Sequence, residues 1–184
     1  MLHPFTLALA CATATCLPAF ASQQCEGPLK RTAADFVAVG DGSQVYDERS
    51  KLVWMRCIED QSWNGSMCVA NDPDAVNPGP RLTYQQAKAL AVEKSTGEER
   101  WRLPTRKELL SLREPNCHNP SLNLKVFPSK PAWSSDGFFW TSTPEAKGVS
   151  LVSAIGTSDA WATTDDENTN HVRLVRTPSS PSRK

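Results

Sequence analysis

Short apolar segments separated by turn residues open the charged part of the chain. Apolar positions predict strands over residues 35–39, 44–47 and 52–55. Gly40-Asp41-Gly42 lies between the first two segments and is typical of a tight turn, because glycine readily adopts positive φ. This pattern indicates antiparallel hairpins in the first third of the chain.

Two capping boxes then predict two short helices. In the first, Thr83 and Gln86 have the spacing that satisfies free amides at a helix start, and Gly97 is expected to end the helix. Its apolar face has helical spacing and consists of Tyr84, Ala87, Leu90 and Ala91.

The second box, Thr105-Arg106-Lys107-Glu108, predicts a helix whose Leu109 and Leu112 face the core. Glu114-Pro115 is expected to stop it, because proline restricts the residue before it and cannot continue a helix.

The remainder alternates between predicted strands and irregular segments. Strands are expected over residues 138–142, 149–155 and 171–176, and the fold class is α+β. Long irregular loops are expected over 59–82, 113–135 and 157–170, and a disordered tail over 177–184. One domain, residues 22–176, would hold the two helices and the hairpins.

Composition narrows the function classes. The 184 residues carry 20 Lys and Arg against 20 Asp and Glu, so the formal net charge is zero. Nucleic-acid binding is disfavoured, because phosphate contacts depend on a basic surplus.

The amino terminus has the pattern of an export signal. Residues 7–20 are apolar or small, and Ala19-Phe20-Ala21 fits the signal peptidase pattern, so cleavage is expected after Ala21. Pro18 and the short apolar length disfavour a membrane anchor. We expect a periplasmic or secreted protein; a lipoprotein acylated at Cys11 or Cys16 is the alternative.

Cleavage would leave four cysteines, and an even count in an exported protein predicts disulfides. Three pairings exist. The favoured one joins Cys57 to Cys68, which flank a polar segment, and therefore Cys25 to Cys117. A zinc site is disfavoured, because no CxxC is present.

A set of motifs in a fixed order resembles the Lcl C-terminal domain family, named for a collagen-like bacterial adhesin. The resemblance covers residues 33–176, and its most specific parts are Trp101-Arg102-Leu103-Pro104-Thr105 with Glu108-Leu109, and Val172-Arg173-Leu174-Val175-Arg176. It implies a C-type-lectin-like fold and an exported bacterial protein. The namesake is linked to sulfated polysaccharides, but the collagen-like repeat is absent from this chain.

The tryptophans divide into two groups. Trp54, Trp101 and Trp140 lie in the motifs and on predicted strands, so we expect them in the core. The candidate contact residues are Trp63, Trp133 and Trp161, because they lie in or beside irregular segments. Four arginines near the strands are expected to pair with Asp41, Asp47 or Glu108; they are Arg56, Arg102, Arg173 and Arg176.

Metal and catalytic interpretations are weaker. Asp165 and Asp166 open an acidic loop that offers oxygen ligands for calcium, but consecutive carboxylates are more often only solvated, and we expect no cofactor. Glu114-Pro115-Asn116 matches the Glu-Pro-Asn calcium motif of C-type lectins in sequence, but the Trp-Asn-Asp motif that accompanies it downstream is absent. His118 and His171 have no evident nucleophile, so we expect no enzyme.

The sequence therefore predicts a non-catalytic binding protein that uses the loops of a lectin-like scaffold. An envelope protein partner is favoured, as for an inhibitor, immunity protein or accessory subunit. The alternative is an adhesin-like module for a cell-surface or sulfated polysaccharide. A remote alternative is an enzyme related to formylglycine-generating folds, whose redox-active cysteine pair has no counterpart that we identify.

Overall fold

The computed structural model describes residues 23–72, 81–118, 120–128, 138–144, 150–154, 160–162 and 168–179. The predicted export signal and most of the predicted tail lie outside these residues. Within them, no helix combines the length and apolar character needed to cross a lipid bilayer.

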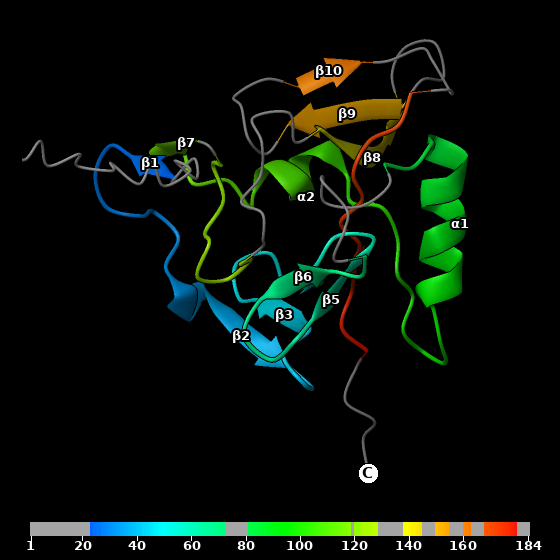
Figure 1. Cartoon of the computed structure of the whole chain (residues 1–184), viewed down its shortest axis with the longest axis horizontal. Coiled ribbons are helices and arrows are strands. Elements are labelled where there is room, and N and C mark those ends of the chain that lie inside the picture. The colour runs from blue at the N-terminus through cyan, green and yellow to red at the C-terminus, as the bar shows by residue number, and fades with distance from the viewer. Residues whose placement is uncertain are drawn as a thin grey trace, which may run out of the picture.

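A four-stranded antiparallel sheet forms one side of the molecule (Figure 1). Its strand order is β11-β4-β3-β2, and Val45 pairs with Trp54 at its centre. The three strands predicted in the first third of the chain are confirmed as β2 Phe36–Val39, β3 Gln44–Asp47 and β4 Leu52–Met55.

The last predicted strand is much shorter than expected. Residues 171–176 were expected to be extended throughout, but only β11 Val175–Arg176 pairs with β4, and His171 forms a parallel bridge with Phe139. Side chains explain the difference: the Glu59 carboxylate accepts from the Val172 amide, and the Arg173 guanidinium donates to backbone carbonyls. These groups replace part of a regular ladder.

A second sheet has the order β10-β9-β8 and lies across the molecule from the first (Figure 1). The strands β8 Phe138–Pro144 and β9 Ser150–Ala154 correspond to the two predicted strands, and α2 packs against both. The strand β10 Ala160–Ala162 corrects the expectation that residues 157–170 are irregular throughout.

Both helices begin at their predicted caps. The helix α1 Tyr84–Lys94 starts after Thr83, and α2 Arg106–Leu110 starts after Thr105, each with its capping box formed. Both end early. The hydroxyl of Ser95 donates to the Ala91 carbonyl and accepts from the Trp101 amide, so α1 ends before Gly97. The helix α2 ends at Leu110, four residues before Glu114.

Residues 59–82 contain a hairpin that the sequence did not predict. The strands β5 Gln61–Trp63 and β6 Cys68–Ala70 pair antiparallel, and the Cys57–Cys68 disulfide ties the hairpin to the end of β4. The Asn64 side chain accepts from the Ser66 and Met67 amides and closes the turn. Each strand has only three residues, which is too short for an apolar alternation to be recognised from sequence.

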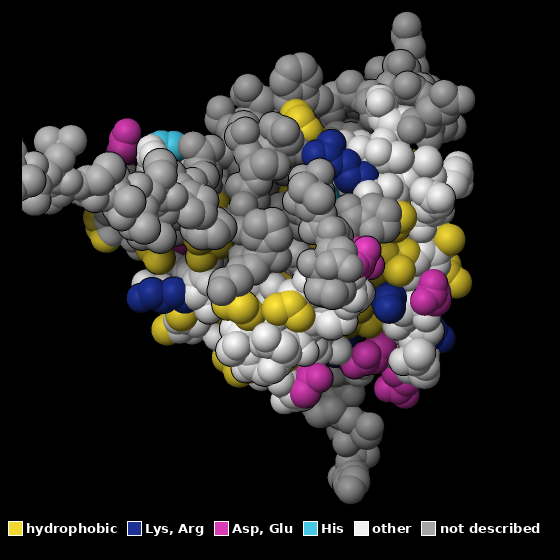
Figure 2. Space-filling model, viewed as in Figure 1, with side chains coloured by type: hydrophobic (Ala, Val, Ile, Leu, Met, Phe, Trp, Pro, Cys, Tyr) yellow, Lys and Arg dark blue, Asp and Glu magenta, His cyan; other side chains and the backbone are white. Residues whose placement is uncertain are grey.

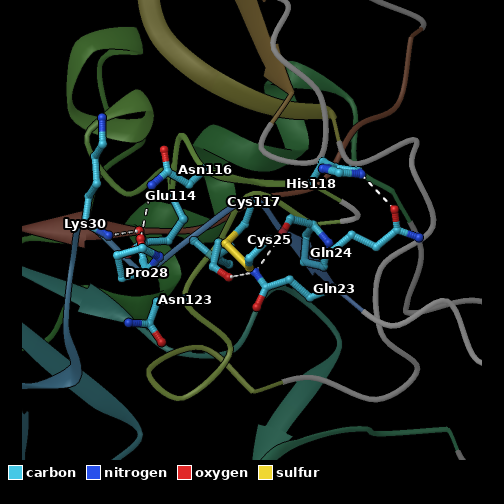
Figure 3. Close-up of a disulfide and its surroundings, with 12 residues drawn as sticks. Gln23, Gln24, Cys25, Pro28, Lys30, Glu114, Asn116, Cys117, His118 and Asn123 are labelled. Atoms are coloured by element: carbon cyan, nitrogen blue, oxygen red, sulfur yellow. Dashed lines mark hydrogen bonds between the residues drawn. A yellow bond between two sulfur atoms is a disulfide. The ribbon is translucent and has the colours of Figure 1, made fainter.

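The second disulfide, Cys25–Cys117, fastens the amino-terminal segment to the body (Figure 3). It joins β1 Gln24–Cys25 to β7 Cys117–His118, which lies within the predicted loop 113–135. Both disulfides therefore follow the favoured pairing.

Glu114 holds the same segment, which corrects its interpretation as a simple helix stop. Its fully buried carboxylate accepts from the backbone amides of Lys30 and Arg31, and Asn116 donates to the Pro28 carbonyl (Figure 3). A short 3-10 turn, η1 Ala33–Asp35, then leads into β2.

Two apolar clusters form the core. The first lies between the main sheet and the segments after α2, and it includes Trp54, Leu109, Leu112 and Phe127. The second joins α1 to β8 and the carboxy-terminal segment, and it includes Trp101 and Trp140. The three tryptophans expected in the core are thus buried.

A buried ion pair ties the amino-terminal segment to β3. Two guanidinium nitrogens of Arg31 donate to both carboxylate oxygens of Asp47, whose side chain is fully buried. Burial alone would raise the pKa of Asp47, but hydrogen bonds from Arg31, Ser50 and the Arg49 amide outweigh it and lower that pKa.

Asp47→Asn should therefore cost about 3–5 kcal/mol of unfolding free energy at neutral pH, because it leaves Arg31 buried without its counter-charge. The Asp47 contribution is present above its unfolded pKa of about 3.9 and is lost as pH falls through its lower folded pKa. Urea unfolding should show that the difference in unfolding free energy between the unmodified chain and Asp47→Asn becomes smaller below about pH 4. Glu48→Gln, which breaks the exposed pair with Lys51, should cost less than about 1 kcal/mol. A free-energy difference between the unmodified chain and Asp47→Asn that does not change with pH would contradict this role of the Arg31–Asp47 pair.

Candidate functional site

A cleft of about 420 Å³ lies between the β5–β6 hairpin, the β3–β4 pair and the carboxy-terminal half of α1. Residues from five separate parts of the chain line it. Its lining combines apolar, polar and charged side chains, and it includes Cys57 of the Cys57–Cys68 disulfide. A concave surface with this mixed lining is the usual form of a ligand site.

Trp63 is the predicted contact residue that the structure places in this cleft. Its indole packs over the turn at Gly42, where an added Cβ would lie 3.2 Å from Nε1. The Arg56 guanidinium lies 4.6 Å from the ring centroid. The indole is therefore held from two sides while it remains partly exposed to the cleft.

Two carboxylates at the cleft have no ion-pair partner among the described residues. Asp41 Oδ1 accepts from the hydroxyl and the amide of Ser43, and these bonds lower the pKa of Asp41. Asp60 has a φ of 59°, an uncommon value for a residue other than glycine. Lys94 supplies the positive charge of the lining.

Glu59, which lines the cleft, forms a buried pair with His171. His171 Nδ1 lies 2.8 Å from Glu59 Oε1, and the other carboxylate oxygen accepts from the Val172 amide. Burial raises the pKa of Glu59, although the bonds from His171 and Val172 oppose this rise. Both oxygens of Glu59 bind protein groups, so the pair acts as a structural anchor.

The remaining lining combines apolar side chains with neutral polar ones. Ser62 donates to the Asn71 side chain across the hairpin, and Gln44 accepts from Arg176. The apolar part of the lining consists of Met55, Ile58, Leu90, Val172 and Leu174. Such apolar side chains suit the carbon stem of a ligand whose polar end meets the polar part of the lining.

The other predicted contact residues are not brought to this cleft by the described part of the chain. Trp133, Asp165 and Asp166 lie outside the described residues, and Trp161 is described only by its backbone, paired with Val152 in the second sheet. Among the described residues, no group of three or more His, Cys, Asp or Glu side chains could hold a metal ion.

Sequence reasoning did not identify Asp60, Glu59 or Lys94 as cleft residues. Asp60 and Glu59 come directly before β5, and Lys94 comes from the end of α1, so only the tertiary fold brings them together. The nearest sequence signal was the turn Gly40-Asp41-Gly42, which supplies both the carboxylate and the space for Trp63.

The predicted arginine pairings are partly correct. Arg102 pairs with Glu108 as expected, at 2.7 Å. Asp47 pairs instead with Arg31, Arg176 pairs with Glu99, and Arg56 packs on Trp63. Arg173 is buried, and its guanidinium donates to the carbonyls of residues 55 and 56.

The family model described as the Lcl C-terminal domain matches residues 43–176, well over half of the chain. No curated protein and no solved structure gives a significant match.

Gly42→Ala should displace the Trp63 indole, because its Cβ would meet Nε1 at a φ of 89°. We expect a loss of about 1–3 kcal/mol and a shift of the Trp63 indole resonance in a nitrogen–proton NMR spectrum. Gly40→Ala is the matched control, since Gly40 also has positive φ but no atom within 4 Å of an added Cβ. An unmoved Trp63 resonance in Gly42→Ala would contradict this packing.

Proposed function

Because the chain belongs to the Lcl C-terminal domain family, we propose that it is a non-catalytic binding module whose ligand site is the Trp63 cleft. The single observation that carries this proposal is the held but partly exposed indole in a mixed apolar and polar hollow. An aromatic side chain fixed in advance adds contact area with little loss of conformational entropy on binding.

The proposed ligand is a protein of the bacterial envelope or its surroundings. An adhesin-like role with a sulfated polysaccharide is the alternative, and the charges of the cleft count against it. Asp41 and Asp60 would repel sulfate groups. Acidic side chains gather at the lower right of the face in Figure 2, with basic ones among them, so this face offers no continuous basic track among its described residues.

We propose that the scaffold is C-type-lectin-like and that the protein is exported after cleavage behind Ala21. Two helices, antiparallel sheets and two disulfides support the first part. The same disulfides support the second, because such bonds persist in oxidising compartments. We also propose that the protein is not an enzyme. In support, both disulfides leave no free thiol as a nucleophile among the four cysteines that they join, which are Cys25, Cys57, Cys68 and Cys117.

Trp63→Ala should abolish retention of the partner when the purified exported chain is used as bait in an envelope extract. The expected loss of affinity is at least tenfold, typical of a central aromatic contact. Tyr84→Ala is the matched control, because Tyr84 is a partly buried aromatic residue that packs on Trp140 away from the cleft lining. Bound material is identified by mass spectrometry after high-salt and glycosidase washes.

Equal retention by both variants would contradict the cleft as the binding site. Retention of carbohydrate, lost after glycosidase treatment, would favour the adhesin-like alternative over a protein partner.

A chelator should change neither partner retention nor the melting temperature, since we propose that binding needs no metal. The variant Asp165→Asn/Asp166→Asn, measured by thermal unfolding with calcium and with chelator, addresses the acidic loop directly. A calcium-dependent rise in melting temperature that this variant removes would overturn the proposal and make the loop a calcium site.

A further inference from the structure

We propose that the Trp63 cleft receives a lysine or arginine side chain of the partner, with its carbon stem on the apolar side chains of the lining and its cationic end between Asp41 and Asp60. This inference deepens the proposed function and rests on it, since it names the chemical class that the cleft recognises.

The cleft lining carries more acidic than basic side chains. Asp41 and Asp60 both line the cleft without an ion-pair partner among the described residues, whereas Glu59, which also lines it, is bound to His171 and Val172. Ser43 donates both of its bonds to the same Asp41 oxygen, Oδ1, and these bonds favour the ionised carboxylate. The fold therefore leaves two carboxylates available to an incoming cation.

In the described part of the chain, the cationic side chains near the cleft do not pair with these carboxylates. Lys94 lies at the end of α1 and is exposed, and Arg56 packs on the Trp63 ring outside the cleft lining. Neither forms an ion pair with Asp41 or Asp60. A ligand cation would therefore meet these carboxylates without displacing an internal partner.

The cleft lining contains apolar side chains as well as these carboxylates. Met55, Leu90 and Leu174 line the cleft, as Trp63 does, and a small polar ligand would leave their apolar surface exposed to water. Lysine and arginine combine a flexible carbon stem with a charged end, and they commonly bury the stem against apolar surface. The apolar and the acidic residues of the lining match the two halves of such a side chain.

Titration with N-acetyl-L-arginine amide, followed in nitrogen–proton NMR spectra of the full chain, tests this class of ligand. A single side chain should bind with a dissociation constant on the order of 1 mM. The shifts should concentrate on the Trp63 indole and on the amides of residues 41–44 and 60–63. N-acetyl-L-citrulline amide, which is neutral and nearly isosteric, should bind roughly tenfold more weakly.

Asp41→Asn/Asp60→Asn should weaken the arginine amide roughly tenfold and remove its preference over the citrulline amide. Asparagine at position 41 retains an oxygen that can accept from Ser43, so the turn is expected to persist. Glu93→Gln, an exposed carboxylate on α1 outside the cleft lining, is the matched control and should bind as the unmodified chain does. Unfolding midpoints of all variants establish that they are folded.

Equal binding of the arginine and citrulline amides would overturn the inference, as would arginine binding that the double variant leaves unchanged. Shifts at Trp63 with neutral cello-oligosaccharides and none with the arginine amide would also overturn it. These outcomes are separate from the proposed function, which fails if Trp63→Ala retains the partner. Loss of the partner in Trp63→Ala without arginine binding would keep the site and refute only its ligand class.

Discussion

Buried anchoring of residues 171–174 onto residues 55–59 is the constraint on which the rest of the molecule depends. Glu59 binds His171 and the Val172 amide, while the fully buried Arg173 donates to the carbonyls of Met55 and Arg56. Burial lowers the pKa of Arg173 to about 10, so it remains a cation at neutral pH. Its charge is stabilised by these carbonyls, by the Phe127 ring and by the field of Glu59.

This anchor couples the two halves of the core. Arg173 packs over Phe127 in the first cluster, whereas Val172 and Leu174 belong to the second. Val172, Leu174 and Glu59 also line the cleft, so the interactions that join the clusters fix this part of its lining. The hairpin wall is held separately, through the Cys57–Cys68 disulfide and the packing of Trp63 on Gly42. A ligand would therefore meet a site that is already ordered, which lowers the entropic cost of binding.

The sequence was informative wherever the deciding interaction is local. Both helix starts were predicted, because the bonds of each capping box join residues three apart, and β3 and β4 were predicted to the residue. Helix ends and the β5–β6 hairpin were missed. The end of α1 involves Ser95, whose hydroxyl accepts from the amide of Trp101 in the following segment. The hairpin strands have only three residues each and are too short to be recognised from their pattern, although the disulfide beside them was predicted. Trp63 was identified from its irregular surroundings. Its carboxylate neighbours were not, because they come from segments that only the tertiary fold brings together.

Hydrogen–deuterium exchange of the full chain, free and bound to the partner it retains, tests most directly whether the cleft is the binding surface. The account predicts protection concentrated in peptides that cover residues 41–44, 59–63 and 90–94, which line the cleft. Peptides from α2 and from the pairing of β1 with β7 should exchange as they do in the free protein. Protection confined to residues 113–135 or 157–170, with the cleft peptides unchanged, would contradict the account and place binding on the other loops.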